Sequence, residues 1–332
     1  MGYKIAVVGA TGVVGQEMLK ILWERKIPIS EIYAFASEKS EGTHVNFGEE
    51  KIKVEKADVS NISKADFALF SIGEDISLEL APKVAQKGTI IIDNSNAFRM
   101  DPNVPLVIPE INPEDLNNHK NIIANPNCST IQMLVALNPL HKKWKLKRIF
   151  VATYQSVSGK GKDAINELLQ STEAYLKGQD ISPTVFPYPI AFNLIPHIDS
   201  FEEGNYTREE IKMVRETHKI LHDSSIKVSP TCVRAPIIRG HSEAILAEFE
   251  REFTLKEVYE TLEKAPGVKV IDNPKEKKYP MPFYCNGKDD VFVGRLREDL
   301  FEPKAINIWV VSDNIRKGAA LNAVQILERL IM

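Results

Sequence analysis

One cysteine stands where turn-forming residues give way to an apolar run. Cys128 follows Asn125-Pro126-Asn127 and precedes the mostly apolar residues 131–137, so a helix is expected to begin beside it. A helix N-terminus has unpaired N–H groups and a partial positive charge, which favour a thiolate and can hold a developing oxyanion. We therefore interpret Cys128 as a candidate nucleophile, with burial as a small apolar residue as the alternative.

A later segment contains an arginine and a histidine close together. Residues 234–243 form an irregular stretch between two strand-like runs, and Arg234 and His241 lie within it. A guanidinium can hold a carboxylate through two N–H groups, and a neutral imidazole can move a proton near pH 7. Combined with a thiolate, the two side chains indicate acyl transfer. Taken singly, each is more simply explained by an ion pair or a boundary position.

A loop with three glycines follows the first apolar run of the chain. The run 3–8 ends in Gly9-Ala10-Thr11-Gly12-Val13-Val14-Gly15 and passes into a helical pattern at 18–22. Glycines here allow a tight turn and let a pyrophosphate approach the helix N-terminus, so the loop predicts dinucleotide binding. The spacing is GxxGxxG rather than GxGxxG, and the prediction depends on its place after a first strand.

Strands and helices alternate after this loop. Strands are expected at 32–36, 67–71, 89–93 and 122–124, with a helix at 77–86, and this order predicts a parallel sheet. The second strand ends in Ser37-Glu38-Lys39-Ser40. A cation flanked by hydroxyls favours the 2′-phosphate of NADP, whereas the adjacent Glu38 leaves a solvated loop as the alternative.

A second loop of small residues lies beyond Cys128. The strand-like run 148–155 ends at Gln155, and residues 156–161 then lead into a helix expected at about 163–176. Within this loop Ser158 and Gly159 could approach a nicotinamide or a bound anion, or could form a surface turn.

A capping box predicts one more helix. Thr207 and Glu210 have the spacing of such a box, and Glu209 and Lys212 then lie one turn apart on the helix. By themselves these two charges are typical of an exposed ion pair.

The composition argues against several classes of protein. With 332 residues, 43% hydrophobic and 26% charged, the chain is globular and long enough for two domains. A net charge of −3 without basic runs argues against nucleic-acid or membrane partners and favours a small-molecule substrate. Three cysteines without CxxC spacing predict neither disulfides nor a metal site. We expect a cytoplasmic protein, since we find no signal sequence and no apolar run of about 18 residues.

Taken in order, these stretches resemble the aspartate-semialdehyde dehydrogenase family from Lys4 through the C-terminal helix. The matching stretches are the cofactor loop 9–15, an anion loop at 94–99, the nucleophile motif 125–128, and 155–159, 191–196, 234–242 and 313–320. Any one of them could arise by chance, but the ordered set is specific. Lys39 departs from many relatives, which have arginine there, and a single ammonium cannot make the bidentate contact.

The resemblance implies a reversible reaction in which NADPH reduces L-4-aspartyl phosphate to L-aspartate 4-semialdehyde and releases phosphate. The reaction belongs to the biosynthesis of lysine through diaminopimelate, and of threonine, methionine and isoleucine. Cys128 would form a thioester, His241 would act as acid and base at the hemithioacetal oxygen, and Gln155 would orient the intermediate. The substrate would contact Arg234 through its α-carboxylate, Glu209 through its ammonium group, Arg99 and Lys212 through its phosphate, and Asn127. The cofactor would contact Gly9, Thr11, Gly12, Val13, Val14, Gly15, Ser37, Lys39, Ser40, Ser158, Gly159 and Asn314.

The implied architecture is α/β, with an N-terminal Rossmann-type parallel sheet and a second mixed α/β domain for catalysis and dimerisation. We expect the first domain over residues 1–127, the second over 128–313, and a helix over 314–332 that returns to the first. An apolar stripe at Ala319, Ala320, Ala323, Val324, Leu327 and Leu330 supports this return. The resemblance further implies a homodimer or a dimer of dimers.

Three other functions stay open at this point. A related acyl-phosphate reductase, such as N-acetyl-glutamyl-phosphate reductase, would act on an acylated amine, which needs no carboxylate such as Glu209. A non-catalytic dinucleotide-binding homologue would not require the four residues Cys128, Gln155, Arg234 and His241 together. A thiol hydrolase unrelated to dinucleotides is disfavoured by the glycine loop.

Overall fold

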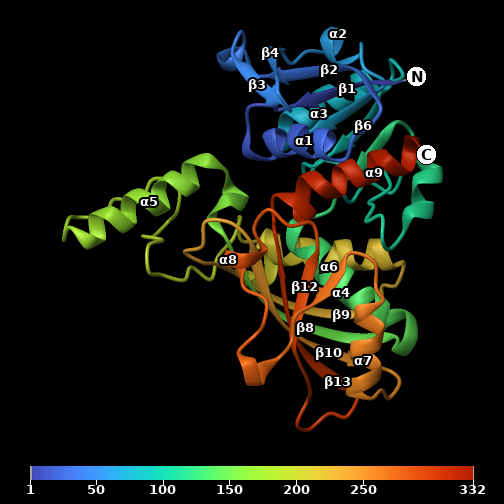
Figure 1. The fold of residues 1–332 in the computed structure, drawn as a ribbon, viewed down its shortest axis with the longest axis vertical. Coiled ribbons are helices and arrows are strands. Elements are labelled where there is room, and N and C mark those ends of the chain that lie inside the picture. Colours follow the sequence, from blue (N-terminus) through green and yellow to red (C-terminus); the bar gives the residue numbers. More distant parts are fainter. Residues whose placement is uncertain (1, 332) are drawn as a thin grey trace. The chain divides into compact units, whose positions relative to one another are not determined.

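The computed structural model describes residues 2–331 and is drawn in Figure 1 with colours that follow the sequence. The chain divides into two compact units. One contains the residues up to Asn127 together with those from Ala319 onward, and the other contains residues 128–318. We expected the chain to return to the first domain from residue 314. In the structure the residues from Ala319 onward belong to the first unit. The chain is α/β as predicted.

The first unit is built on a seven-stranded sheet in the order β3-β4-β2-β1-β5-β6-β7. Its neighbouring strands are parallel, except that β3 and β4 form an antiparallel pair. The strands are β1 (Tyr3–Val8), β2 (Ile29–Ala36), β3 (His44–Phe47), β4 (Glu50–Lys56), β5 (Phe67–Phe70), β6 (Ile90–Asp93) and β7 (Ile122–Ala124). The predicted Rossmann-type parallel sheet is therefore confirmed, with an additional strand pair that alternation in the sequence did not indicate.

Helices cover this sheet and close its core. They are α1 (Val13–Glu24), α2 (Val59–Ile62), α3 (Glu74–Ala85) and α9 (Leu321–Ile331), with short 3₁₀ turns at Glu38–Ser40 and Pro113–Asn118. Apolar residues of α1, such as Met18 and Leu22, share one buried cluster with Val324 and Leu327 of α9. The C-terminal apolar stripe is buried in the first unit because it completes this core. A π-helical turn at Arg316–Ala320 precedes α9.

The second unit contains a mixed six-stranded sheet in the order β11-β12-β13-β10-β8-β9. β8 pairs with β9, and β11 with β12, in parallel, whereas the other neighbours are antiparallel. The strands are β8 (Leu146–Gln155), β9 (Lys227–Arg234), β10 (His241–Phe249), β11 (Val268–Val270), β12 (Val291–Glu298) and β13 (Ala305–Ser312). The last three strands lie in a part of the sequence where we predicted no strand.

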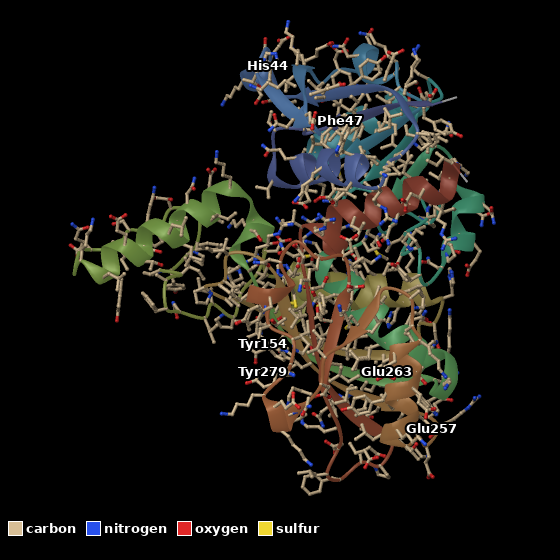
Figure 2. The ribbon with its side chains drawn as sticks, in the orientation of Figure 1. His44, Phe47, Tyr154, Glu257, Glu263 and Tyr279 are labelled. Atoms are coloured by element: carbon tan, nitrogen blue, oxygen red, sulfur yellow. The ribbon has the colours of Figure 1, made fainter. Side chains whose placement is uncertain are left out.

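The two faces of this sheet differ in their cover. Its helices are α4 (Cys128–Trp144), α5 (Lys162–Leu176), α6 (Arg208–Leu221), α7 (Leu255–Glu263) and α8 (Pro282–Cys285). Figure 2 labels Glu257 and Glu263 on α7, and Figure 1 shows α5 extending away from the sheet. Along β8 the side chains alternate between buried and partly exposed, so α4, α6 and α7 cover only one face. Tyr154, whose ring lies 5.8 Å from that of Trp309, belongs to the open face.

No helix within residues 2–331 is long and apolar enough to span a membrane. Over the same residues we find no group of three or more His, Cys, Asp or Glu side chains arranged to hold a metal ion.

Candidate active site

The candidate nucleophile is the first residue of α4, which confirms the helix start expected beside it. Cys128 is partly exposed, whereas Cys232 and Cys285 are buried, and no disulfide links the described cysteines. A Cβ added at Gly318 would lie 2.8 Å from the Cβ of Cys128, so glycine at that position leaves room for the thiol. The thiol therefore stands at the positive end of a helix with access to small reagents.

Three other predicted residues lie at one edge of the sheet. Gln155 ends β8 and Arg234 ends β9, and the two are register partners. His241 begins β10, whose antiparallel pairing with β8 places its first residues beside the end of β8. Parallel strands end at the same edge and an antiparallel neighbour begins there. The topology thus brings together side chains that are up to 86 residues apart in the chain.

Arg234 is held by the main chain of a loop residue. It is 6% exposed, and its Nη1 donates to the Ser156 carbonyl oxygen at 2.7 Å. Burial lowers the pKa of Arg234, whereas the charges of Glu209 and Cys128 raise it, and a guanidinium stays protonated in either case. A Cβ at Gly159 would lie 3.3 Å from this Nη1 and 3.6 Å from the His241 ring, so Gly159 leaves the space beside both side chains open.

His241 is fully buried, in contrast to the boundary position that its place in the sequence suggested. Its Nδ1 accepts from the Ser156 N–H at 3.0 Å and lies 3.1 Å from the Ser156 hydroxyl oxygen. Its Nε2 is buried and has no hydrogen-bond partner among the described residues. Burial is the main cause, and the charge of Arg234 the second, that lowers the pKa of His241 to about 3. The ring is therefore neutral near pH 7.

Glu209 and Lys212 are not the exposed ion pair that their spacing alone indicated. Glu209 is 5% exposed and accepts from Nε2 of Gln155 at 3.0 Å. Its other carboxylate oxygen lies 3.3 Å from Nζ of Lys212, and that Nζ is 2.7 Å from Asp199. The capping box at Thr207 and Glu210 is present, as predicted, and fixes the start of α6. Glu209 is thus a buried carboxylate aimed at the sheet edge that carries Gln155 and Arg234.

The side chain of Asn314 is hydrogen-bonded to the second loop of small residues, 156–161. Its side-chain oxygen accepts from the hydroxyls of Ser156 and Ser158, at 3.1 and 3.2 Å, and from the Gly240 N–H at 2.8 Å. Asp313 holds this turn, because it accepts from Arg239 and from the N–H groups of residues 287, 315 and 316. Ser156, Asp199 and Arg239 were not predicted as site residues. These three residues contribute to the site through tertiary contacts, for which the sequence contains no local signal.

The glycine loop of the first unit is shaped for a phosphate. Gly9 has φ +87°, and a Cβ there would lie 2.1 Å from the Ser71 carbonyl oxygen. A Cβ at Gly15 would lie 2.2 Å from the Gly9 carbonyl oxygen. The N-terminus of α1 has neither a capping side chain nor an acidic residue in its first turn. A close turn before an uncapped helix end fits a dinucleotide pyrophosphate.

The remaining predicted residues all belong to the first unit. Thr11 and Ser40 lie 3.5 Å apart through their hydroxyl oxygens, which brings the glycine loop to the end of β2. Ser37 and Lys39 are exposed there. Arg99 is 7% exposed and donates to the Asn94 carbonyl oxygen at 2.9 Å, and Asn127 is 6% exposed. Arg99 and Asn127 belong to the first unit, whereas Gln155, Arg234 and His241 belong to the second.

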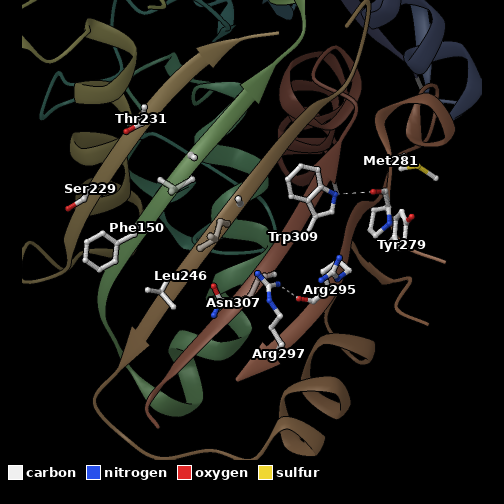
Figure 3. A pocket seen from close by; sticks show the side chains of 16 residues that line it. Phe150, Ser229, Thr231, Leu246, Tyr279, Met281, Arg295, Arg297, Asn307 and Trp309 are labelled. Atoms are coloured by element: carbon white, nitrogen blue, oxygen red, sulfur yellow. Dashed lines mark hydrogen bonds between the residues drawn. The ribbon is translucent and has the colours of Figure 1, made fainter. Parts of the chain in front are cut away.

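A groove on the open face of the six-stranded sheet contains none of the predicted residues. Figure 3 shows it beside Phe150, Leu246 and Trp309, with Arg295 and Arg297 on one side. The Trp309 indole N–H donates to the Pro280 carbonyl oxygen at 2.9 Å. Most of this lining is apolar and carries neither a nucleophile nor a proton carrier, so we assign it no part in the chemistry.

Two family models match most of the chain. Residues 4–119 match "Semialdehyde dehydrogenase, NAD binding domain", and residues 137–317 match "Semialdehyde dehydrogenase, dimerisation domain".

Curated proteins and solved structures are similar over almost their whole length. Aspartate-semialdehyde dehydrogenase of Aquifex aeolicus is 54% identical, covering 100% of this chain and 98% of that protein. The Bacillus subtilis protein of the same name is 48% identical, with coverages of 99% and 97%. The crystal structure of aspartate semialdehyde dehydrogenase II from Vibrio cholerae, complexed with ASA, has a TM-score of 0.96, 45% identity and coverages of 100% and 98%. The Candida albicans enzyme with NADP has a TM-score of 0.77, 25% identity and coverages of 100% and 99%.

Proposed function

The chain belongs to the aspartate-semialdehyde dehydrogenase family, and from this we propose the reaction that it catalyses. The enzyme interconverts L-4-aspartyl phosphate with L-aspartate 4-semialdehyde and phosphate, using NADPH or NADP⁺, in the cytoplasmic biosynthesis of amino acids. The observation that carries the proposal is a group of four side chains at one sheet edge: Arg234, Glu209, Gln155 and a neutral His241. The charge of Arg234 also interacts with that of Cys128.

Cys128 is the nucleophile in this proposal. The partial positive charge at the start of α4 and the charge of Arg234 both favour its thiolate. The sulfur attacks the carbonyl carbon of the acyl phosphate, the carbon–oxygen bond to phosphate breaks, and a thioester on Cys128 remains. In the opposite direction the same sulfur adds to the aldehyde carbon and forms a hemithioacetal.

His241 and Gln155 act on the oxygen of the reacting carbonyl. The Nε2 of His241 is buried and has no hydrogen-bond partner within residues 2–331, so a substrate oxygen can complete its hydrogen bonding. Gln155 is held by Glu209 and Thr153, at 3.0 Å each, and orients the intermediate. Hydrogen-bond donation of this kind to a developing oxyanion contributes about 10²- to 10³-fold in rate.

The substrate carries charges opposite to those of the residues around it. We assign the α-carboxylate to Arg234 and the ammonium group to Glu209, because both side chains are buried at this sheet edge and carry the complementary charges. Lys212 is assigned to the phosphate, together with Arg99 of the first unit. Binding of the ammonium would exchange one cation beside Glu209 for another, which limits the cost of burying that carboxylate.

The cofactor assignment follows from the fit of the glycine loop to a phosphate. The residues that would hold NADP are those of the loop 9–15 with Ser37, Lys39 and Ser40, and Ser158, Gly159 and Asn314 of the second unit. When bound, NADPH would supply the hydride that reduces the carbonyl carbon of the thioester. Lys39 is exposed at the end of β2, where an ammonium can neutralise a 2′-phosphate.

We further propose that two chains pair through the open face of the six-stranded sheet. This face is apolar at Phe150, Leu246 and Trp309 and lies within the part of the chain that matches a dimerisation domain. A sheet face of this kind exposes apolar area that a second copy would bury. Assembly into a dimer of dimers would need a further surface.

The test of the function is a requirement for two substrates. NADP⁺ reduction should need both aspartate semialdehyde and phosphate or arsenate, and Cys128→Ala should reduce turnover to background, whereas Cys232→Ala should retain it because that buried thiol takes no part. Wild-type turnover by Cys128→Ala, or reduction without phosphate or arsenate, would contradict the proposal. Replacing aspartate semialdehyde with N-acetylglutamate semialdehyde separates this activity from that of the related reductase.

A further inference from the structure

The main chain of Ser156 contacts two side chains of the site, the charged Arg234 and the proposed proton carrier His241. Its carbonyl oxygen accepts from Arg234 at 2.7 Å, and its N–H donates to Nδ1 of His241 at 3.0 Å. Both contacts are buried. A main-chain N–H can only donate, so the nitrogen that faces it must offer a lone pair. In this arrangement Nδ1 of His241 carries no proton, and the proton of the neutral ring is on Nε2.

The surroundings of the ring support the same assignment. His241 is fully buried, and its charged neighbours are Arg234, which disfavours a cationic ring, and Glu209, which favours one. The Gly240 carbonyl also favours a protonated ring, but burial and Arg234 outweigh both and lower the pKa to about 3. A second proton would have to enter Nδ1, where the Ser156 N–H already points.

The hydroxyl network behind Ser156 keeps its main chain in place. The Ser156 hydroxyl lies 3.1 Å from both the Ser158 hydroxyl and the Asn314 side-chain oxygen, and Asn314 accepts in addition from Gly240. Gly240 directly precedes His241 in the chain. Asn314 therefore connects the segment of Ser156 with the segment of Gly240 and His241. The separation of these two segments sets the distance between the Ser156 N–H and the His241 ring.

We propose that Ser156 is a positioning residue that holds His241 as the neutral Nε2–H tautomer, so that the ring donates a hydrogen bond to the substrate oxygen. The inference rests on the proposed function for the identity of that oxygen. In this form the ring has no lone pair on Nε2 with which to take the thiol proton of Cys128. The thiolate therefore forms by loss of its proton to water, favoured by the helix N-terminus and Arg234.

The first experiment reads the tautomer in the enzyme without substrate. Long-range ¹H–¹⁵N spectra of protein labelled at its seven histidines, recorded from pH 5 to 8, should show His241 with an unprotonated Nδ1 and a protonated Nε2 throughout. The His241→Asn spectrum identifies the signals by their loss. A proton on Nδ1, or titration of His241 with a midpoint near 6.5, would overturn the inference.

Two substitutions at one position separate the N–H from the hydroxyl. Ser156→Ala keeps the N–H and should retain the Nε2–H signature. Ser156→Pro suits the local φ of −65° but replaces the N–H with a ring carbon, so the signature should be lost or the ring should titrate. Retention of the signature in a folded proline variant would refute the role of Ser156. Should that variant not fold, loss of the signature in Ser156→Ala, with its N–H intact, would show that the hydroxyl is what matters.

The second experiment asks whether His241 is the base for Cys128. Cys232 and Cys285 are buried, so iodoacetamide should modify Cys128, as peptide mass spectrometry will verify. The pH dependence of alkylation should be the same in the wild type and in His241→Asn, with rates within about twofold. A midpoint raised by one pH unit or more in the variant would contradict the proposal. These readouts need no turnover, so they remain valid even if the enzyme fails the substrate test above.

Discussion

Glu209 shows how far a single side chain can depart from the behaviour expected of its type. A glutamate in the first turn of a helix is usually solvated, but this one is 5% exposed and is bonded to Gln155 and Lys212. A buried carboxylate is costly unless its oxygens are paired. The contacts with Gln155 and Lys212 hold the carboxylate of Glu209 facing the sheet edge, which suits a site for a substrate cation.

The first residue-scale prediction concerns this carboxylate. Glu209→Gln should raise the KM for aspartate semialdehyde about ten- to hundredfold, because a hydrogen bond to a charged group contributes about 1.5–3 kcal/mol. Steady-state kinetics at saturating phosphate measures the change. Asp199→Asn is the matched control, since it also removes a carboxylate from Lys212, and it should change this KM by no more than about twofold. Equal effects of the two substitutions would mean that only the charge of Lys212 matters.

The second residue-scale prediction concerns the pH dependence of stability. The pKa of His241 is lowered from 6.5 to about 3 in the folded protein by burial and by Arg234. Between these two values the unfolded chain binds a proton that the folded protein does not, so this group makes stability fall as the pH falls from about 6.5 towards 3. At pH 5 the loss relative to pH 7.5 should be about 2 kcal/mol. Denaturant unfolding of His241→Asn should lack this part of the loss, and an identical loss in both proteins would contradict it.

At the scale of single elements, the start of α1 combines a backbone requirement with an electrostatic one. Gly9 adopts a left-handed φ, and Gly15 approaches the Gly9 carbonyl too closely for any side chain. The N-cap of this helix is Gly12, which has no side chain to bond the first N–H groups, and this suits the binding of an anion there. The same seven residues thus provide both a tight turn and an anion site.

The element-scale prediction compares two glycines of this loop. Gly15→Ala should lower the melting temperature by several degrees and abolish NADP⁺ binding, because its Cβ would lie 2.2 Å from a main-chain oxygen. Gly12→Ala meets the same oxygen at 3.3 Å and should fold with a smaller loss of stability. Thermal unfolding and calorimetric titration with NADP⁺ measure the two effects. A Gly15→Ala protein as stable as Gly12→Ala would contradict the packing argument.

At the scale of the whole molecule, the second unit has one protected and one open sheet face. Helices α4, α6 and α7 lie on one side of the sheet, and α4 begins at Cys128, the proposed nucleophile. The opposite side carries the apolar groove drawn in Figure 3. Chemistry and proposed self-association therefore use different faces of the same sheet, and the shared strands connect them.

The whole-molecule prediction tests the open face. Leu246→Arg places a charge in the lining of the groove and should convert a dimer into single chains, as measured by light scattering on a sizing column. Ile76→Arg on α3, where the native side chain is 52% exposed, is the control and should leave the mass unchanged. A Leu246→Arg protein that keeps the mass of two chains would place the interface elsewhere.

Several features of this protein follow from short stretches of sequence. The strand and glycine turn at the N-terminus, the start of α4 at Cys128 and the capping box of α6 each depend on residues a few positions apart. Backbone conformation and helix capping are local interactions, so their signals survive in a linear pattern. The same locality explains why the parallel sheet of the first unit was predictable whereas β11, β12 and β13 were not: these lack a regular alternation with helices.

The site itself depends on contacts between distant residues. Glu209 reaches Gln155 across 54 positions, and His241 reaches Ser156 across 85. Whether a given histidine is neutral, or a given glutamate is buried, depends on which strands end beside it, and that is a property of the sheet order. From the residues alone Cys128 was a reactive thiol at a helix start, and the family resemblance supplied its partners. Only the tertiary structure shows which atoms of those partners are occupied, and among residues 2–331 it leaves Nε2 of His241 without a hydrogen-bond partner, because burial and pairing are decided by packing across the whole unit.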